Sequence, residues 1–196
     1  VKKHQLWAQF FGERNNDVFY LPSFEEAESE FEAGNPKFFQ HVANKWIPPV
    51  YLNTDVYIKR MMVNAEYILK VANDAAGLSG QSAFIHVVGF GLGCWRVTKK
   101  QADYQIEAYY RVIEKYSLPH VSDINFYGFD GESKCRDTET GQYIETENGN
   151  RIKFLVEPRE PAEKLVGENE GKLLVVCFSW DSNAFPGNEY WKGLIS

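Results

Sequence analysis

The sequence of 196 residues contains three cysteines and no CxxC pair. Cys94, Cys135 and Cys177 are odd in number and far apart, so the sequence indicates neither a disulfide framework nor a zinc site. This usage is typical of reduced cysteine in a cytosolic protein. We therefore predict a cytoplasmic location and no bound metal.

Long apolar runs are absent as well. No stretch is long enough to cross a bilayer, and the N-terminal sequence VKKHQLWAQF lacks the apolar core of a signal peptide. We predict that the protein does not associate with membranes. Because the chain begins at Val1 rather than Met and stops at Ser196 just after a dense motif, we expect it to be cut from a longer protein.

Basic residues are outnumbered by acidic ones. The 21 Lys and Arg residues stand against 27 Asp and Glu residues, for a formal net charge of -6. A surface that grips a nucleic-acid backbone needs the opposite sign, so we expect no nucleic acid as a partner. A cationic substrate group such as a guanidinium is more compatible with this charge.

What the sequence does contain is a globular composition, 44% hydrophobic, in a length that suits one domain. Aromatic residues at 15% suit a core with bulky edges or a pocket that stacks planar ligands. PSFEEAESEFEAG predicts a short acidic helix, because Ser23 and Glu26 have the capping-box spacing and Gly34 can end the helix. We assign residues 1–46 to an N-terminal extension that contains this helix.

Two longer helices are expected after the short strand VYLN. The first begins at Thr54, a good N-cap, has Asp55 in its first turn, and is expected to end at Gly77. The second follows Thr98 and Gln101, which again have capping-box spacing. The inner stripes predicted from helical spacing are Tyr57, Met61, Ala65, Ile68, Ala72 and Ala76 in the first helix, and Ala102, Ile106, Tyr109, Ile113 and Tyr116 in the second.

Further strands are predicted around these helices. Ala83–Val88 reads as a buried strand, HVSDINFYGF as another, and GKLLVVCFSW as a last strand whose apolar character favours a central position. GQYIETENGNRIKFLVE predicts a β-hairpin around Asn148 and Gly149, which accept positive φ; we interpret residues 128–160 as a hairpin insertion. The order strand, helix, strand, helix, strand, hairpin, strand predicts one α/β domain built on a mixed sheet.

Three glycines follow the strand of residues 83–88. Gly89, Gly91 and Gly93 in VVGFGLGCW allow a backbone to approach phosphate closely. They do not form the dinucleotide fingerprint, because position 94 is a cysteine and the next helix starts later. A tight turn against Trp95 explains these glycines equally well.

Polar residues also stand at the start of the first long helix. Asn53, Thr54 and Asp55 lie at a helix N-terminus, where the ligands of open α/β folds collect. Plain capping accounts for Thr54 and Asp55. That leaves Asn53 as the more informative candidate.

A nucleophilic or metal site has weaker support. Cys94 can be paired with His86 or His120, but His86 lies in an apolar run that favours a core histidine. Asp123 and Asp181 are single acids on separate strands, which is not a metal-binding pattern.

The densest group of polar residues is WDSNAFPGNEYW, residues 180–191, directly after the last apolar strand. The proline-glycine turn at 186–187 can bring Asp181 and Glu189 toward one spot, while Asn183 and Asn188 can bind hydroxyl groups. Paired carboxylates that face a sugar are the machinery of glycosidic cleavage. An Asx-turn at Asp181 and a helix-starting Glu189 are the structural alternative; the density of polar groups beside a buried strand favours a site.

Three segments, NTDVYIKRM…NAEYIL, FIHVVGFGLGCW and WDSNAFPGNEYW, together resemble a macrodomain-related family of ADP-ribosylhydrolases. Members act on ADP-ribosyl-arginine and occur among bacterial effectors and their eukaryotic relatives. The resemblance extends from about Val50 to Trp191. It implies a macrodomain-like three-layer sandwich, an ADP-ribose pocket and no cofactor. The consecutive-glutamate signature of the better-known glycohydrolases is absent, which disfavours cleavage of poly-ADP-ribose.

Carried over residue by residue, the resemblance implies that Asp181 and Glu189 are the catalytic acids at the distal ribose. The ligand-binding residues that it implies are Asn183, Gly187, Asn188 and Trp191 in the same loop, Gly89, Gly91 and Gly93 toward the diphosphate, and Asn53, Thr54 and Asp55 toward the rest of the nucleotide. The family pattern leads us to expect another acidic segment after WKGLIS, where this sequence stops.

ADP-ribose and an ADP-ribosylated protein are the partners that follow from this resemblance. Two other functions stay open at the level of the sequence. One is a module that binds ADP-ribose without cleaving it, which would not need both Asp181 and Glu189. The other is an interaction domain that uses the aromatic loop as a docking surface.

Overall fold

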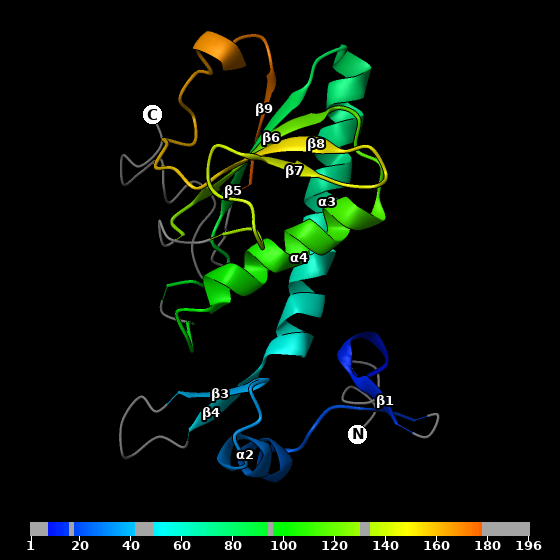
Figure 1. Ribbon diagram of the computed structural model, residues 1–196, viewed down its shortest axis with the longest axis vertical. Helices are drawn as coiled ribbons and strands as arrows, with labels where there is room; N and C mark the ends of the chain where they lie inside the picture. Colours follow the sequence, from blue (N-terminus) through cyan, green and yellow to red (C-terminus); the bar gives the residue numbers. More distant parts are fainter. Residues whose placement is uncertain (1–7, 16–17, 42–48, 94–95, 130–133, 178–196) are drawn as a thin grey trace, which may run out of the picture.

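The computed structural model describes residues 8–15, 18–41, 49–93, 96–129 and 134–177 (Figure 1). Its centre is a five-stranded sheet in the order β7-β8-β6-β5-β9. The strands are β5 (Ala83–Val88), β6 (Val121–Tyr127), β7 (Tyr143–Glu145), β8 (Arg151–Leu155) and β9 (Leu173–Val176). Strands β8, β6, β5 and β9 are parallel, and β7 is antiparallel to β8. The predicted α/β class with a mixed sheet is confirmed.

Helices α3 (Thr54–Ser79) and α4 (Gln101–Lys115) pack against each other and against one face of this sheet. The register pairs Ile85 with Ile124 and Val87 with Phe126, so these side chains share the face under the helices. Most of the predicted stripe of α4 is buried. In α3 the alanines of the predicted stripe are buried, but Ile58 and Leu69 take inner positions that the spacing assigned to Tyr57, Met61 and Ile68.

The opposite face of the sheet is partly polar. His86, Asp123 and Asn125 are buried on it. Asn125 exchanges two hydrogen bonds with the backbone of Glu157, at 3.0 and 3.2 Å. In the described part of the chain, this face is covered by the irregular segment between β8 and β9, which includes the 3₁₀ turn η1 (Gly167–Asn169), and not by an α-helix.

The last strand and the predicted hairpin differ in how well the structure agrees with the sequence. The last strand is not central among the described strands: β9 is the end strand beside β5, and Val176 is 39% exposed. The apolar run of β9 therefore predicted a strand correctly but not its place in the sheet, and none of its four residues is fully buried in the described structure. The predicted hairpin forms around Asn148 and Gly149, and β8 pairs directly with β6. The hairpin is therefore continuous with the main sheet, and its status as an insertion stays a prediction.

Helix α3 is longer than predicted. It runs through Gly77 and ends at Gly80, which adopts the left-handed conformation with φ of 66°. Gly77 has another role, because a Cβ atom there would lie 2.8 Å from the His120 ring. Gly77, which was predicted to end the helix, instead lets the helix approach the loop before β6 closely.

The N-terminal part contains β1 (Glu13–Asn15), β2 (Val18–Tyr20), α2 (Phe24–Glu32), β3 (Phe38–His41) and β4 (Val50–Asn53). The capping box of α2 is confirmed by reciprocal hydrogen bonds between Ser23 and Glu26. Strand β4 is confirmed, but it pairs with the unpredicted β3 and lies outside the five-stranded sheet, at the N-terminal end of α3 (Figure 1). None of the described helices is long and apolar enough to cross a membrane.

Candidate functional site

The loop after β5 contains two glycines that the fold requires. At Gly89 a Cβ atom would lie 2.7 Å from Leu92 Cδ1, so the loop closes over Leu92 because it lacks a side chain there. Gly91 has a φ of 70°, a left-handed conformation that favours glycine. Among the described residues, a Cβ atom on Gly93 would meet no other atom within 4 Å. A tight turn therefore accounts for Gly89 and Gly91, while Trp95, against which the turn was predicted, lies outside the described residues.

The same turn leaves backbone donors available. The Leu92 N–H donates to the Gly89 carbonyl at 3.4 Å, whereas the described residues offer no backbone acceptor to the N–H groups of Phe90, Gly91 and Gly93. Closely spaced backbone N–H groups of this kind can bind anions such as phosphate. The geometry is compatible with a phosphate loop as well as with a tight turn.

The start of α3 is organised differently from the sequence-based interpretation. Asn53, not Thr54, is the N-cap: its Oδ1 accepts from the Val56 N–H at 3.2 Å. Thr54 is buried, and its N–H donates to the Lys37 carbonyl at 2.9 Å. Asp55 forms an ion pair of 2.7 Å with the Lys37 side chain. Both Asn53 and Thr54 are residues of the capping type, so contacts with the segment before β3 decide between them.

A buried glutamine joins these two segments. Gln105 of α4 is 1% exposed, and its Nε2 donates to Tyr57 Oη at 2.6 Å and to the Phe90 carbonyl. Tyr57 belongs to the first turn of α3, and Phe90 belongs to the glycine loop. Burial raises the pKa of Tyr57 against the opposing effect of the amides of Gln105 and Gln101, so its hydroxyl stays protonated. One side chain of α4 thus joins the predicted segment 89–93 to Tyr57, which follows the predicted segment 53–55 in the first turn of α3.

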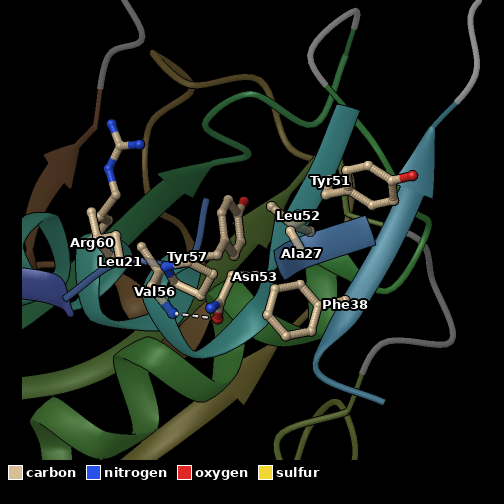
Figure 2. Close-up of a pocket in the computed structure, with 10 residues that line it drawn as sticks. Leu21, Ala27, Phe38, Tyr51, Leu52, Asn53, Val56, Tyr57 and Arg60 are labelled. Atoms are coloured by element: carbon tan, nitrogen blue, oxygen red, sulfur yellow. Dashed lines mark hydrogen bonds between the residues drawn. The ribbon is translucent and has the colours of Figure 1, made fainter. Parts of the chain in front are cut away.

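A cavity of about 230 Å³ opens beside the start of α3 (Figure 2). Asn53 is the predicted ligand residue that lines it, and Figure 2 shows its side chain turned back to the Val56 N–H. The ring of Phe38 and the side chain of Tyr57 form parts of the wall, and Arg60 stands at the other end. A mostly apolar wall with a few polar groups suits a planar ligand.

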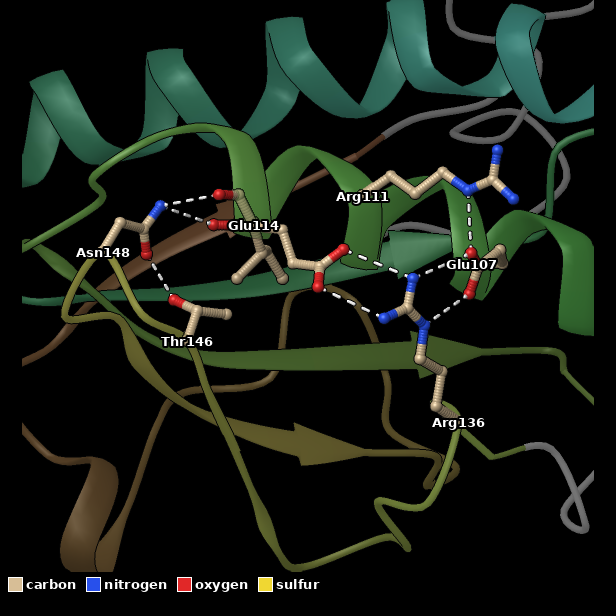
Figure 3. A network of polar contacts seen from close by, with 7 residues as sticks. Glu107, Arg111, Glu114, Arg136, Thr146 and Asn148 are labelled. Atoms are coloured by element: carbon tan, nitrogen blue, oxygen red, sulfur yellow. Dashed lines mark hydrogen bonds and ion pairs between the residues drawn. The ribbon is translucent and has the colours of Figure 1, made fainter.

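Several acidic residues outside the predicted site are already engaged. Figure 3 shows the Arg136 guanidinium between Glu107 and Glu114 of α4, with ion-pair distances of 3.2 Å to each. Partial burial raises the pKa of Glu107, but hydrogen bonds from Arg136 and Arg111 outweigh that effect and leave the pKa below its ordinary value. Arg136 also stacks 3.9 Å from the centre of the Tyr110 ring. These carboxylates hold the loop before β7 against α4 and are poor candidates for a proton-transferring acid.

The rival chemistries find no support in the described residues. Cys135 and Cys177 are buried free thiols, and burial raises the pKa of each to about 12, so neither is a thiolate. His86 is fully buried, and burial together with nearby Arg159 lowers its pKa to about 4, as fits a neutral core histidine. Asp123 is paired with Lys172 at 2.5 Å. No group of residues that could hold a metal occurs in the described ranges, and Cys94 lies outside them.

The predicted catalytic motif lies outside the described residues. The residues concerned are Asp181, Asn183, Gly187, Asn188, Glu189 and Trp191. The chain reaches this segment from β9, which runs parallel to β5, and the Cys177 N–H donates to the His86 carbonyl at 2.8 Å. The last described residue is therefore at the carboxyl edge of the sheet, the edge from which the glycine loop also starts.

Comparison with known proteins decides the family. The family described as "ADP-ribosylhydrolase MavL-like" matches residues 2–196. The chain belongs to this family.

Two curated relatives of the MavL-like chain come from Drosophila melanogaster. "ADP-ribosylarginine hydrolase CG2909" is 33% identical over 142 residues, which cover 70% of this chain and 28% of the relative. "ADP-ribosylarginine hydrolase CG3568" is 28% identical over 198 residues, which cover 97% of this chain and 35% of the relative. The chain thus spans about a third of the length of the curated relatives that it matches. The family resemblance seen in the sequence is confirmed.

In this MavL-like chain the connection through Gln105 was not predicted from the sequence. The signal was present, because Gln105 is a polar residue directly before Ile106 on the inner side of the second helix. Tyr57 was predicted as part of the inner stripe of the first long helix, whereas in the structure its hydroxyl accepts a hydrogen bond from Gln105. Neither residue is conspicuous in the sequence, since only the fold brings α3, α4 and the glycine loop together.

Proposed function

We propose that this chain binds ADP-ribose and hydrolyses the N-glycosidic bond between ADP-ribose and an arginine side chain of a modified protein. Membership of the MavL-like ADP-ribosylhydrolase family carries this proposal. The names of the two Drosophila relatives support arginine as the modified residue. The net charge of -6 is compatible with a guanidinium-bearing substrate and disfavours nucleic acid as a partner.

In the proposed site the glycine loop of Gly89, Gly91 and Gly93 takes the diphosphate. Its backbone donors and its place at the carboxyl edge of a parallel sheet support this assignment. The cavity lined by Asn53 and Tyr57 takes another part of the nucleotide. Thr54 and Asp55 contribute as parts of the same helix start.

In the proposed reaction, Asp181 and Glu189 bind the distal ribose and the attacking water. One carboxylate takes a proton from the water as its oxygen bonds to the anomeric carbon, and both stabilise the oxocarbenium-like centre. The bond between the anomeric carbon and the guanidinium nitrogen breaks, its electron pair stays on that nitrogen, and the nitrogen takes the proton that the carboxylate removed from water. The same loop contributes further ligand-binding residues, Asn183, Gly187, Asn188 and Trp191. No redox step is involved, so we propose that no redox cofactor takes part. We also propose a cytoplasmic location.

The test of this function is turnover in a Glu189→Ala variant. Loss of an acid that positions or deprotonates water lowers the rate of ADP-ribose release about a hundredfold or more. The thermal unfolding midpoint should change little, because the substitution removes a reacting group rather than a core side chain. A variant that releases ADP-ribose from arginine-modified protein at the wild-type rate would overturn the assignment.

The alternative function is a module that binds ADP-ribose without cleaving it. The glycine loop and the neighbouring cavity favour it, because they are binding features and need no catalytic acid. Calorimetric titration measures the affinity for ADP-ribose, and the comparison with AMP shows whether binding requires the distal ribose. If binding requires the distal ribose and weakens in Asp181→Ala, the site includes residues 180–191. If the chain binds ADP-ribose but does not release it from modified protein, the non-catalytic module is supported.

A further inference from the structure

One buried side chain, Gln105, donates a hydrogen bond to the peptide at the centre of the glycine loop. The Phe90 carbonyl can only accept a hydrogen bond, so it fixes the orientation of the Gln105 amide, whose Nε2 must face it. The same nitrogen donates to Tyr57 Oη at 2.6 Å. Gln105 Oε1 is buried and has no partner in the described part of the chain. The side chain thus satisfies two acceptors, one on the glycine loop and one on α3, while its own oxygen stays unpaired among the described residues.

The hydrogen bond to the Phe90 carbonyl also determines the direction of the Gly91 N–H, because both groups belong to the same planar peptide. The described peptide bonds are trans, and in a trans peptide the C=O and the following N–H point in opposite directions. Because the Phe90 carbonyl points to Gln105 of α4, the Gly91 N–H points away from that side chain. Gly91 holds this orientation with a φ of 70°.

We propose that Gln105 is a positioning residue that turns the Gly91 N–H toward the diphosphate of bound ADP-ribose. This inference rests on the proposed function and goes beyond it, since it assigns the loop conformation to a residue of α4 that does not itself touch the ligand. Through Tyr57 the same amide links the loop to the cavity at the start of α3.

The decisive variant is Gln105→Met, which keeps the length of the side chain and removes its donors. The matched control is Tyr109→Phe on the same helix, which deletes a buried hydroxyl that has no partner among the described residues. The backbone amide of Gly91 is followed by NMR in the free protein, and affinity is then measured for ADP-ribose and for adenosine, which lacks phosphate.

In Gln105→Met we expect a shifted Gly91 amide resonance and about tenfold weaker ADP-ribose binding, a loss typical of one hydrogen bond. Adenosine affinity should stay within about twofold, and Tyr109→Phe should match the wild type for both ligands. If Gln105→Met does not fold, Gln105→Asn, whose shorter amide cannot reach Phe90, replaces it. An unchanged Gly91 amide, or an equal loss of ADP-ribose and adenosine binding, would overturn the proposal. If the wild type does not bind ADP-ribose, the proposed function fails, while the Gly91 signal still decides whether Gln105 positions the loop.

Discussion

Gly89 and Gly93 belong to one loop but have different surroundings, and this difference illustrates how neighbours determine the role of a residue. Leu92 lies under Gly89, whereas no described residue comes within 4 Å of a Cβ atom built on Gly93. Two residues of one type, four positions apart, are therefore expected to respond differently to the same substitution.

We predict that Gly89→Ala lowers the free energy of unfolding by about 1–3 kcal/mol, since the added methyl must displace Leu92. Gly93→Ala should stay within about 0.5 kcal/mol of the wild type. Urea unfolding of both variants checks the pair. Equal stability of the two variants would contradict the loop geometry.

Asn53 provides a second test at this scale, because the structure makes it the cap that the sequence assigned to Thr54. Asn53→Ala should cost about 1 kcal/mol of unfolding free energy, and Asn53→Asp, which retains a capping oxygen, should cost almost nothing. The measurement is again urea unfolding. A harmless Asn53→Ala would show that another group caps α3.

His86 predicts a pH dependence of stability. Its pKa falls from the ordinary value of 6.5 to about 4 in the folded state, chiefly through burial. The unfolded chain then binds a proton between these values and the folded chain does not, so stability falls as the pH drops from 6.5 toward 4. From pH 7 to pH 5 we expect a loss of about 2 kcal/mol from this group. His86→Phe, which keeps a ring beside Tyr127, should flatten that slope; an identical slope would exclude His86 as its source.

At the scale of elements, the hairpin of β7 and β8 also secures the end of α4. Asn150 is buried, donates to the carbonyls of Ile113 and Tyr116 at 2.7 Å each, and accepts from the Leu118 N–H at 2.7 Å. Asn148 donates to the same end of the helix, as Figure 3 shows. The turn sequence thus satisfies carbonyls that a helix end leaves unpaired.

Asn150→Ala should therefore lower the unfolding free energy by about 1–3 kcal/mol, because the Leu118 N–H loses its acceptor and two carbonyls that Asn148 also reaches each lose one donor. Asn148→Ala, in a more exposed position, should cost about 1 kcal/mol. Thermal and urea unfolding measure both. A smaller loss for Asn150→Ala than for Asn148→Ala would contradict the assigned hydrogen bonds.

Local signals predicted these elements well and their arrangement less well. The capping box at Ser23, the strand of residues 83–88 and the turn at Asn148 depend on neighbouring residues, so the sequence alone reveals them. Strand β3 was missed because its short, irregular sequence shows no period, and its partner β4 is needed to define it. The position of β9 depends on pairing between distant segments, which an apolar run does not encode.

At the scale of the whole molecule, the candidate site combines segments that are far apart in the sequence. The glycine loop and the start of α3 were predicted from their own residues, and the family match supports the resemblance that joined them. Gln105 was not predicted, because its importance arises from the crossing of α3 and α4 beside β5. The roles of Asp181 and Glu189 stay predictions, since their segment lies outside the described residues.

The most direct test of the central claim is the release of ADP-ribose by this chain from a protein modified on arginine, with the same protein modified on glutamate as the comparison. The proposed N-glycosidic hydrolysis predicts release from arginine that rises with time and enzyme concentration, and no release from the glutamate ester. If the folded chain binds ADP-ribose but releases none from arginine, the hydrolase assignment is contradicted and the chain acts as a binding module.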